Sequence, residues 1–191
     1  MRRTNDFYET AAWQVDALVD NLPELHGTIW CPTVGDGSLL RRLQERRPDL
    51  GPFLTNDIDP TKPADLHTDA TSADGWNQMV ARFTHYPDWV IDNFPFNVEH
   101  RIIPYAYQVA LCGVVAMARV SYCEPTRDRG PWLSQHAYQK RITLERHSFT
   151  GNGKTDSATT DWLIWSKISL ADPFGISAFG YRDGHIKTER V

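Results

Sequence analysis

Short apolar runs alternate with amphipathic helical patterns along the first half of this sequence, and this alternation constrains the fold more than any other feature. Strand-like runs end at Cys31, Thr55 and Ile91, and helical patterns separate them. Strands that alternate with helices form a parallel sheet with helices on both faces, because each helix carries the chain back along the sheet. We therefore expect an α/β fold. The 191 residues are 41% hydrophobic, enough to bury one sizeable core.

The second half of the chain predicts a strand at residues 114–122 and two further strands that pair with each other. Residues 141–149 alternate polar and apolar side chains, residues 161–168 do so less cleanly, and a polar, glycine-containing tip separates the two segments. We place them as an antiparallel pair at the edge of the sheet. Because no segment is left over, we expect residues 1–191 to form a single domain without a separate target-recognition domain.

Composition excludes several classes of protein. No run of about 18 apolar residues occurs, and the polar start of the chain lacks the apolar segment of a signal peptide, so we expect no membrane partner and a cytoplasmic location. The three cysteines, Cys31, Cys112 and Cys123, are odd in number, and no Cys or His lies near them at the spacing of a metal motif. We therefore expect reduced thiols, with neither a disulfide framework nor a metal site.

Charge is unevenly distributed along the chain. Residues 119–154 contain seven basic and three acidic residues, a local balance of +4, so the remainder carries −8 in a chain whose total is −4. A basic face on an acidic body suits an enzyme that binds a polyanion, although an ordinary solvated surface explains the pattern equally well. Under the first explanation, the candidate nucleic-acid contacts are Arg127, Arg129 and Lys154.

A glycine-containing turn follows the first strand pattern and leads into a helical pattern. Gly35 and Gly37 would let a ligand approach the backbone, and a helix N-terminus favours an anionic group. The full dinucleotide fingerprint requires a third glycine where this chain has Leu40, so a nicotinamide or flavin cofactor is disfavoured. Asp57 lies about 20 residues further on, the spacing that places a carboxylate on a ribose hydroxyl. Considered singly, Asp57 also fits an ordinary turn.

The apolar run at residues 89–91 leads into a turn that alternates polar, aromatic and proline residues. Ligands bind at the carboxyl ends of parallel strands, and Pro95 ends regular strand pairing here. The Asn93 side-chain oxygen and the Phe94 carbonyl could accept the two N–H groups of a ring-bound amine, and the Phe96 ring could stack on that ring. Considered alone, the stretch fits an Asx-turn followed by two core aromatic residues better.

Together these motifs resemble class I S-adenosylmethionine-dependent methyltransferases that modify amino groups, a group that includes the N6-adenine DNA methyltransferases. Their hallmark, Asp/Asn/Ser-Pro-Pro-Tyr/Phe, matches residues 93–96 at three of four places, with Phe94 where the first proline is expected. Cys31 is a second departure, since many relatives carry an acidic residue there. Small phage-type methyltransferases look similar around residues 146–151 and 162–165.

The resemblance spans about residues 6–167 and implies a Rossmann-like methyltransferase fold. This fold has a mostly parallel seven-stranded sheet with an antiparallel edge pair and helices on both faces. The resemblance implies S-adenosyl-L-methionine as the cofactor, with a motif at Tyr8 and Thr10 for the methionine carboxylate, Asp57 for the ribose and Asp69 near the adenine amino group. The full implied set is Tyr8, Thr10, Pro32, Gly35, Asp36, Gly37, Asp57, Ile58, Asp69 and Ala70 for the cofactor, and Asn93, Phe94, Pro95 and Phe96 for catalysis.

An exocyclic amine is a poor nucleophile, because its lone pair is delocalised into the ring. Accepting both of its N–H groups favours the pyramidal nitrogen of the transition state, so no general base or metal is needed. Three hypotheses follow. The first is a methyltransferase acting on adenine N6 in DNA, the second a methyltransferase acting on an RNA base or a protein glutamine. The third is a binding protein with this fold that has lost catalysis through the departures at Phe94 and Cys31. The sequence does not indicate an oligomeric state.

Overall fold

The structure is a computed structural model that describes residues 9–145, 159–171 and 178–180. The strands in these residues are β1 Ile29–Cys31, β2 Phe53–Thr55, β3 Trp89–Asp92, β4 Gly113–Arg119, β5 Lys140–Leu144, β6 Thr160–Ser166 and β7 Ala178–Gly180. The helices are α1 Ala12–Asn21, α2 Ser38–Arg46, α3 Ala73–Phe83, α4 Glu99–Val109, α5 Gly130–Leu133 and the 3-10 helix η1 Val120–Cys123. No helix in the described ranges has the length and apolar composition needed to cross a membrane.

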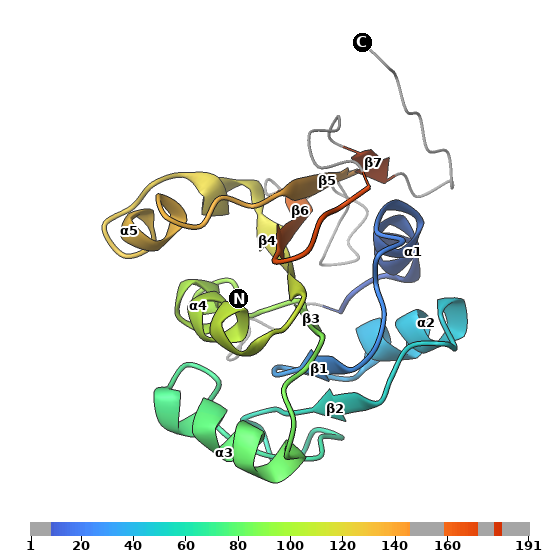
Figure 1. The fold of residues 1–191 in the computed structure, drawn as a ribbon, viewed down its shortest axis with the longest axis vertical. Coiled ribbons are helices and arrows are strands. Elements are labelled where there is room, and N and C mark those ends of the chain that lie inside the picture. Colours follow the sequence, from blue (N-terminus) through green and yellow to red (C-terminus); the bar gives the residue numbers. More distant parts are fainter. Residues whose placement is uncertain (1–8, 146–158, 172–177, 181–191) are drawn as a thin grey trace, which may run out of the picture.

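The seven described strands form one sheet in the order β2-β1-β3-β4-β6-β5-β7 (Figure 1). The pairs β1–β2, β1–β3 and β3–β4 are parallel, and β6 runs antiparallel to both β4 and β5. The mostly parallel seven-stranded sheet and the antiparallel pair are therefore confirmed. The pair is not outermost, because β7 lies parallel to β5 beyond it.

The expected strand at 114–122 is shorter than its apolar pattern suggests. Strand β4 ends at Arg119, which pairs with the first residue of β6, Thr160. Beyond this pair the chain turns into η1, and Val120 is exposed on the surface. The Val120 N–H still donates to the Thr159 carbonyl at 3.0 Å, and the chain then leaves the sheet as η1.

Helices cover both faces of the sheet, as the alternating pattern predicts. In Figure 1, α1 and α2 lie on one side of the strands and α3 and α4 on the other. Side chains of β3 alternate between these layers, because neighbouring residues of a strand point to opposite faces. Trp89 and Ile91 join the cluster of α1 and α2, Val90 joins that of α3 and α4, and all three are fully buried. Each fully buried apolar side chain of this size contributes about 1.5–3 kcal/mol.

Helix α3 positions a loop that borders the site described below. The hydroxyl of Ser72, the residue before the helix, accepts a hydrogen bond from the Gly75 N–H at 3.1 Å. The indole Nε1–H of Trp76 donates to the Ala70 carbonyl at 2.8 Å. Gly75 lies so close to the Asp69 backbone that a Cβ atom there would be 2.0 Å from its carbonyl oxygen. The absent side chain at position 75 is therefore what allows the loop to pack on the helix.

We expect Gly75→Ala to destabilise the protein by about 1–3 kcal/mol, because relieving this overlap requires the loop at Asp69 to move. The overlap should outweigh the gain of about 1 kcal/mol in helix propensity. Urea denaturation followed by circular dichroism measures the change in free energy of unfolding. Asn77→Ala, at an exposed position of the same helix, is the matched control. An unchanged midpoint for Gly75→Ala would contradict the packing described here.

Candidate active site

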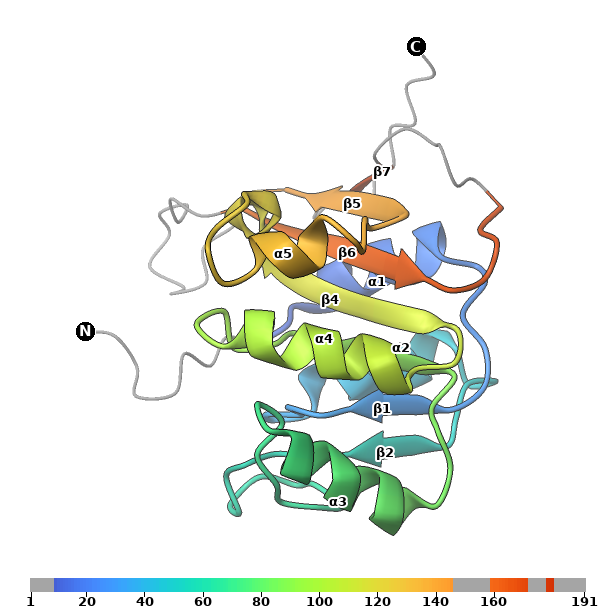
Figure 2. The ribbon, with the colours of Figure 1, turned by 60° about the vertical axis from the view of Figure 1, so that its left-hand side comes forward.

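The strands β1, β2 and β3 run parallel, so their carboxyl ends lie at one edge of the sheet. Figure 2 shows the ends of β1 and β2 on the same side as the start of α4. A pocket of about 350 Å³ opens there, and its walls come from the turns that follow these three strands. A volume of this size lies within the range of small-molecule sites, and this edge of a parallel sheet is where such sites occur. The pocket brings together most of the predicted cofactor residues: Thr10, Pro32, Gly35, Asp36, Asp57, Ile58, Asp69 and Ala70.

The glycine turn between β1 and α2 forms one wall of the pocket. Gly35 and Gly37 have φ angles of 59° and 74°, in the left-handed region that favours glycine. Gly37 immediately precedes α2, and its missing side chain would point toward Arg41 rather than into the pocket. Gly35 lines the pocket itself. The turn therefore exposes backbone atoms to a ligand through Gly35, while Gly37 serves the geometry of the helix start.

Asp57 links the turn after β2 to the glycine turn. Its Oδ2 accepts a hydrogen bond from the Gly35 N–H at 2.9 Å, and its Oδ1 accepts one from the Asp59 N–H at 2.9 Å. The carboxylate lines the pocket although the residue is only 9% exposed. Beside it Ile58 is 65% exposed, an apolar side chain presented to solvent at the pocket rim. Carboxylate oxygens accept more than one hydrogen bond each, so Asp57 retains capacity for a ligand hydroxyl.

The third wall is the loop that α3 holds in place. The Oδ1 of Asp69 accepts hydrogen bonds from the backbone N–H of Thr71 at 2.8 Å and from its hydroxyl at 2.7 Å. These two bonds lower the pKa of the Asp69 carboxyl, which is solvent-exposed. Ala70 beside it is buried. The loop thus presents an ionised carboxylate at the mouth of the pocket and a small apolar surface inside it.

The turn after β3 divides its residues between the pocket and the core. Asn93 and Pro95 line the pocket, and the Asn93 side-chain amide donates to the Thr10 hydroxyl at 3.2 Å. Phe94 is 1% exposed and packs in the core cluster of α3 and α4. Phe96 is half-buried, and the Arg119 guanidinium lies over its ring, 4.7 Å from the centroid. Of the four residues, two therefore face the pocket directly, and the Phe94 ring has a structural role.

Two of the three predicted nucleic-acid contacts, Arg127 and Arg129, lie on the loop that carries η1 and α5. Arg127 is exposed on this loop. The Arg129 guanidinium donates to the backbone carbonyls of Glu124 at 2.8 Å and Ser121 at 2.5 Å and lies over the Tyr122 ring. The Arg129 guanidinium, which the sequence suggested for phosphate contact, therefore stabilises the loop by bonding backbone carbonyls. Tyr8 of the predicted cofactor site and Lys154 of the predicted nucleic-acid contacts lie outside the described residues. Residues 146–151, which carry part of the resemblance, also lie outside them.

Asp92 is a pocket residue that sequence reasoning did not select. It is 2% exposed, and its Oδ2 accepts hydrogen bonds from the Thr33 N–H at 2.6 Å and hydroxyl at 2.9 Å. Its Oδ1 accepts one from the Asn93 N–H at 2.9 Å. Burial raises the pKa of Asp92 from about 3.8 to about 6, although these donors oppose the shift. The signal in the sequence was a carboxylate as the last residue of a buried strand, directly before the selected turn.

Cys31 lies at the end of β1, beside Asp92. The thiol is fully buried, and its pKa is raised well above the ordinary value, first by burial and then by the neighbouring Asp92 carboxylate. It is therefore a neutral thiol. The end of β1 therefore carries an uncharged group, and the end of β3 beside it carries the buried Asp92 carboxyl.

The sequence matches no model of a known protein family, and no curated protein matches it by sequence. Solved structures do match the fold. A Listeria monocytogenes protein described as a candidate class I S-adenosylmethionine-dependent methyltransferase has a TM-score of 0.62 and 13% identity, covering 94% of this chain and 67% of its own. The fold is that of class I S-adenosylmethionine-dependent methyltransferases.

Two further structures with the methyltransferase fold are methylation subunits of restriction systems. The methyltransferase subunit of a type I restriction-modification system from Streptococcus thermophilus has a TM-score of 0.61 and 13% identity, with 85% of this chain covered. The M protein of the type I restriction enzyme EcoKI has a TM-score of 0.58 and 14% identity, with 90% covered. The chain spans 45% and 46% of the lengths of these two subunits.

The raised pKa of Asp92 predicts a pH dependence of stability. Below about pH 4 the carboxyl is protonated in both the folded and the unfolded protein, so it does not alter stability. Between about pH 4 and 6 the unfolded chain releases the proton while the folded protein retains it, so stability falls as pH rises. The difference between pKa values of 3.8 and about 6 corresponds to at most about 3 kcal/mol.

We therefore expect Asp92→Asn to gain stability relative to the wild type as the pH rises from 4.5 to 7.0, by about 2 kcal/mol. Urea unfolding of both proteins at several pH values measures the difference, in which the other titrating groups cancel. Asp74→Asn, which removes an exposed carboxylate on α3, should track the wild type. Parallel curves for the wild type and Asp92→Asn would show that Asp92 is not buried as described.

Proposed function

We propose that this protein is an S-adenosylmethionine-dependent methyltransferase that acts on an exocyclic amine, with adenine N6 in DNA as the substrate. The observation that carries the proposal is that one pocket joins the glycine turn, the Asp57 carboxylate and the Asn93 side chain. The methyltransferase fold supports the cofactor class, and the likeness to two restriction-modification subunits supports DNA as the substrate.

The residues around the pocket fit the parts of this cofactor. S-adenosylmethionine supplies an electrophilic methyl group on a sulfonium ion. In our proposal Asp57 accepts hydrogen bonds from the ribose, Ile58 covers one face of the adenine and Asp69 receives the adenine amino group. The exposed Ile58 side chain and the ionised Asp69 carboxylate suit these roles, because an exposed apolar side chain gains from covering a ring. The Gly35 backbone leaves room beside them.

Asp92 is our candidate for the group that receives the methionine ammonium. A carboxylate that is almost fully buried is costly to ionise unless a cation accompanies it. Asp92 lines the pocket and lies beside Cys31, at the position where related enzymes carry an acid. We propose that Asp92, at the end of β3, takes the role that an acidic residue at position 31, at the end of β1, has in related enzymes. Cys31 would then not prevent binding of the ammonium group.

The Asn93 side-chain oxygen and the Phe94 backbone carbonyl are proposed to accept the two N–H groups of the target amine. This arrangement holds the nitrogen lone pair out of the ring plane and favours the pyramidal geometry of the transition state. The Phe94 ring is anchored in the core, which fixes its carbonyl in place of the rigidity that proline gives relatives. The target ring is proposed to stack on Phe96, an aromatic side chain that the Arg119 guanidinium already contacts, 4.7 Å from the ring centroid.

The substrate class rests on the basic loop as well as on the structural likenesses. A duplex substrate would present phosphates to the loop that carries Arg127, and the target base would have to leave the stack at a cost of a few kcal/mol. Incubation of the protein with labelled S-adenosylmethionine and matched panels of DNA, RNA and protein tests the proposal. Label in adenine of DNA supports it, and label only in RNA or protein would change the substrate. Binding without transfer to any substrate would favour an inactive binding protein.

We expect S-adenosylmethionine to bind more weakly below pH 6, by about tenfold per pH unit, because protonated Asp92 cannot pair with the ammonium. Isothermal titration calorimetry between pH 5.0 and 7.5 measures this change. Asp92→Asn should bind more weakly than the wild type at pH 7.5 and show little dependence on pH. Asp74→Asn is the control, with an exposed carboxylate on α3 that does not line the pocket. Identical profiles for the wild type and Asp92→Asn would remove Asp92 from the ammonium site.

We expect Asn93→Ala to lower kcat by about 100-fold or more while the dissociation constants of DNA and cofactor change little, because Asn93 acts mainly in the transition state. Phe96→Ala should also weaken substrate binding, by about 1–3 kcal/mol for a lost base–aromatic stack. Single-turnover methyl transfer and fluorescence-anisotropy binding separate the two effects. Asn77→Ala, an exposed amide on α3, should behave as the wild type. Full activity in both site variants would leave the turn with only a structural role.

A further inference from the structure

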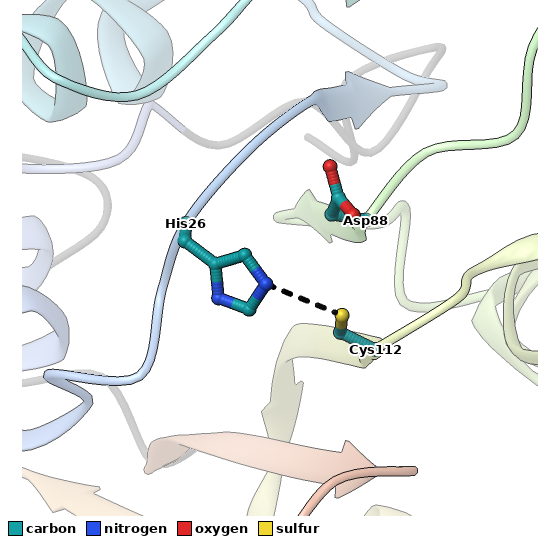
Figure 3. Close-up of side chains that lie close together, drawn as sticks. All are labelled: His26, Asp88 and Cys112. Atoms are coloured by element: carbon teal, nitrogen blue, oxygen red, sulfur yellow. Dashed lines mark hydrogen bonds between the residues drawn. The ribbon is translucent and has the colours of Figure 1, made fainter.

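A second group of polar side chains meets at the opposite, amino-terminal edge of the sheet. His26 precedes β1, Asp88 is the residue directly before β3, and Cys112 is the residue directly before β4. Trp89 pairs with Gly113 in the parallel ladder, so Asp88 and Cys112 are brought side by side as the strands begin. Figure 3 shows the three side chains close together, on three separate segments, with the His26 ring directed toward the Cys112 sulfur. The candidate active site lies at the other ends of these strands and includes none of the three.

The spacing of these donor atoms suits a transition-metal ion. One donor atom from each residue lies within 4.8 Å of the other two, and the Cys112 Sγ is 3.6 Å from the His26 Nε2. Zinc binds sulfur at about 2.3 Å and imidazole nitrogen at about 2.0–2.1 Å with tetrahedral angles, which implies a sulfur–nitrogen separation of about 3.5 Å. The cysteine and histidine are therefore already at ligand spacing, and the carboxylate is close enough to complete a third bond.

The His26 ring is oriented as a metal-binding imidazole is. Its Nδ1 lies 2.7 Å from the Glu24 carbonyl oxygen. A carbonyl only accepts hydrogen bonds, so in the neutral ring Nδ1 carries the hydrogen and Nε2 carries the lone pair that faces Cys112. Metal-binding histidines commonly donate their second ring N–H in this way, which fixes the tautomer and the ring orientation. The same bond argues against a Cys-His-Asp nucleophile, because the Glu24 carbonyl, not the Asp88 carboxylate, orients the histidine.

Backbone features hold the carboxylate in this cluster. The Asp88 Oδ2 accepts a hydrogen bond from the Thr28 N–H at 2.7 Å. Gly27 has a φ angle of 70°, and a Cβ atom at this position would lie 2.0 Å from the same oxygen. Only glycine therefore lets the segment that carries His26 approach Asp88 so closely. Sulfur, nitrogen and carboxylate donors together favour zinc over magnesium or calcium, which prefer oxygen alone.

Charge around the cluster is compatible with a divalent cation. A thiolate and a carboxylate supply two negative charges, and binding would release the Cys112 thiol proton to solvent. Lys167 is the nearby opposing charge, but its ammonium donates to the Ala110 carbonyl at 2.6 Å and lies over the Tyr107 ring, 4.8 Å from the centroid. His26 is exposed, so an ion could reach the cluster from solvent.

We propose that His26, Asp88 and Cys112 form a zinc-binding site that joins the amino ends of β1, β3 and β4. The three protein ligands leave a fourth position that solvent can fill. The site is separate from methyl transfer. His26 and Cys112 are 86 positions apart in the sequence, so spacing along the chain gave no signal of this cluster. The expectation of no metal site rested on the number of cysteines and on the absence of a close Cys/His pair.

The 191-residue protein, freed of metal by chelation, can be titrated with Zn²⁺ alone by competition against a chromophoric chelator. We expect one equivalent to bind and the melting temperature to rise. With Co²⁺ in its place, we expect a thiolate-to-metal charge-transfer absorption. His26→Ala should weaken Zn²⁺ binding by at least about 100-fold, and Cys112→Ser should remove the charge-transfer band. His85→Ala and Cys123→Ser, outside the cluster, should retain both signals.

If Cys112→Ser fails to fold, the His26→Ala variant is sufficient to test the proposal. His26 is exposed, so removing its side chain leaves no cavity. The proposal is overturned if the wild type binds no stoichiometric Zn²⁺ or gives no thiolate band with Co²⁺. It is also overturned if His26→Ala binds Zn²⁺ as tightly as the wild type does. None of these measurements depends on methyl transfer, so their outcome is independent of the proposed enzymatic function.

Discussion

The in-register parallel pairing of β1, β3 and β4 is the constraint on which the rest of the structure depends. Ile29, Trp89 and Gly113 lie side by side in the ladder, so the three strands begin at one level. Helices bury both faces, which leaves only the two ends of the strands for polar groups. Side chains far apart in the sequence consequently gather at each end, the pocket at the carboxyl ends and the His26 cluster at the amino ends.

Acidic groups at the carboxyl ends serve the fold as well as the pocket. Asp57 and Asp92 accept hydrogen bonds from the backbone N–H groups of Gly35 and Thr33, so two buried carboxylates hold the glycine turn against its neighbouring strands. These donors offset part of the cost of burying each charge. The same bonds orient the carboxylates before any ligand arrives, which reduces the conformational entropy that binding would otherwise lose.

The parts of the fold and site that the sequence predicted are those with local signals. Hydrophobic periodicity located the strands of the sheet, and the spacing of two glycines located the glycine turn. The end of an apolar run located Asn93. The remaining features depend on which strands become neighbours. The ring of Phe94 enters the core rather than the pocket, and Arg129 bonds carbonyls of its own loop. The pairing of His26 with Cys112 exists only after β1, β3 and β4 have assembled. No residue spacing encodes these contacts.

The burial of Phe94 has a consequence for how this turn can change over time. Its ring shares the cluster of α3 and α4 with large aromatic side chains such as Trp76 and with several alanines, among them Ala106 and Ala116. Small residues beside large rings are what allow such a core to fill space. Replacing Phe94 with proline would empty this position, and losing a core phenylalanine ring costs about 3–5 kcal/mol. A change at position 94 is therefore coupled to the surrounding side chains, and proline fits there only if neighbouring residues also change to fill the space that the ring leaves.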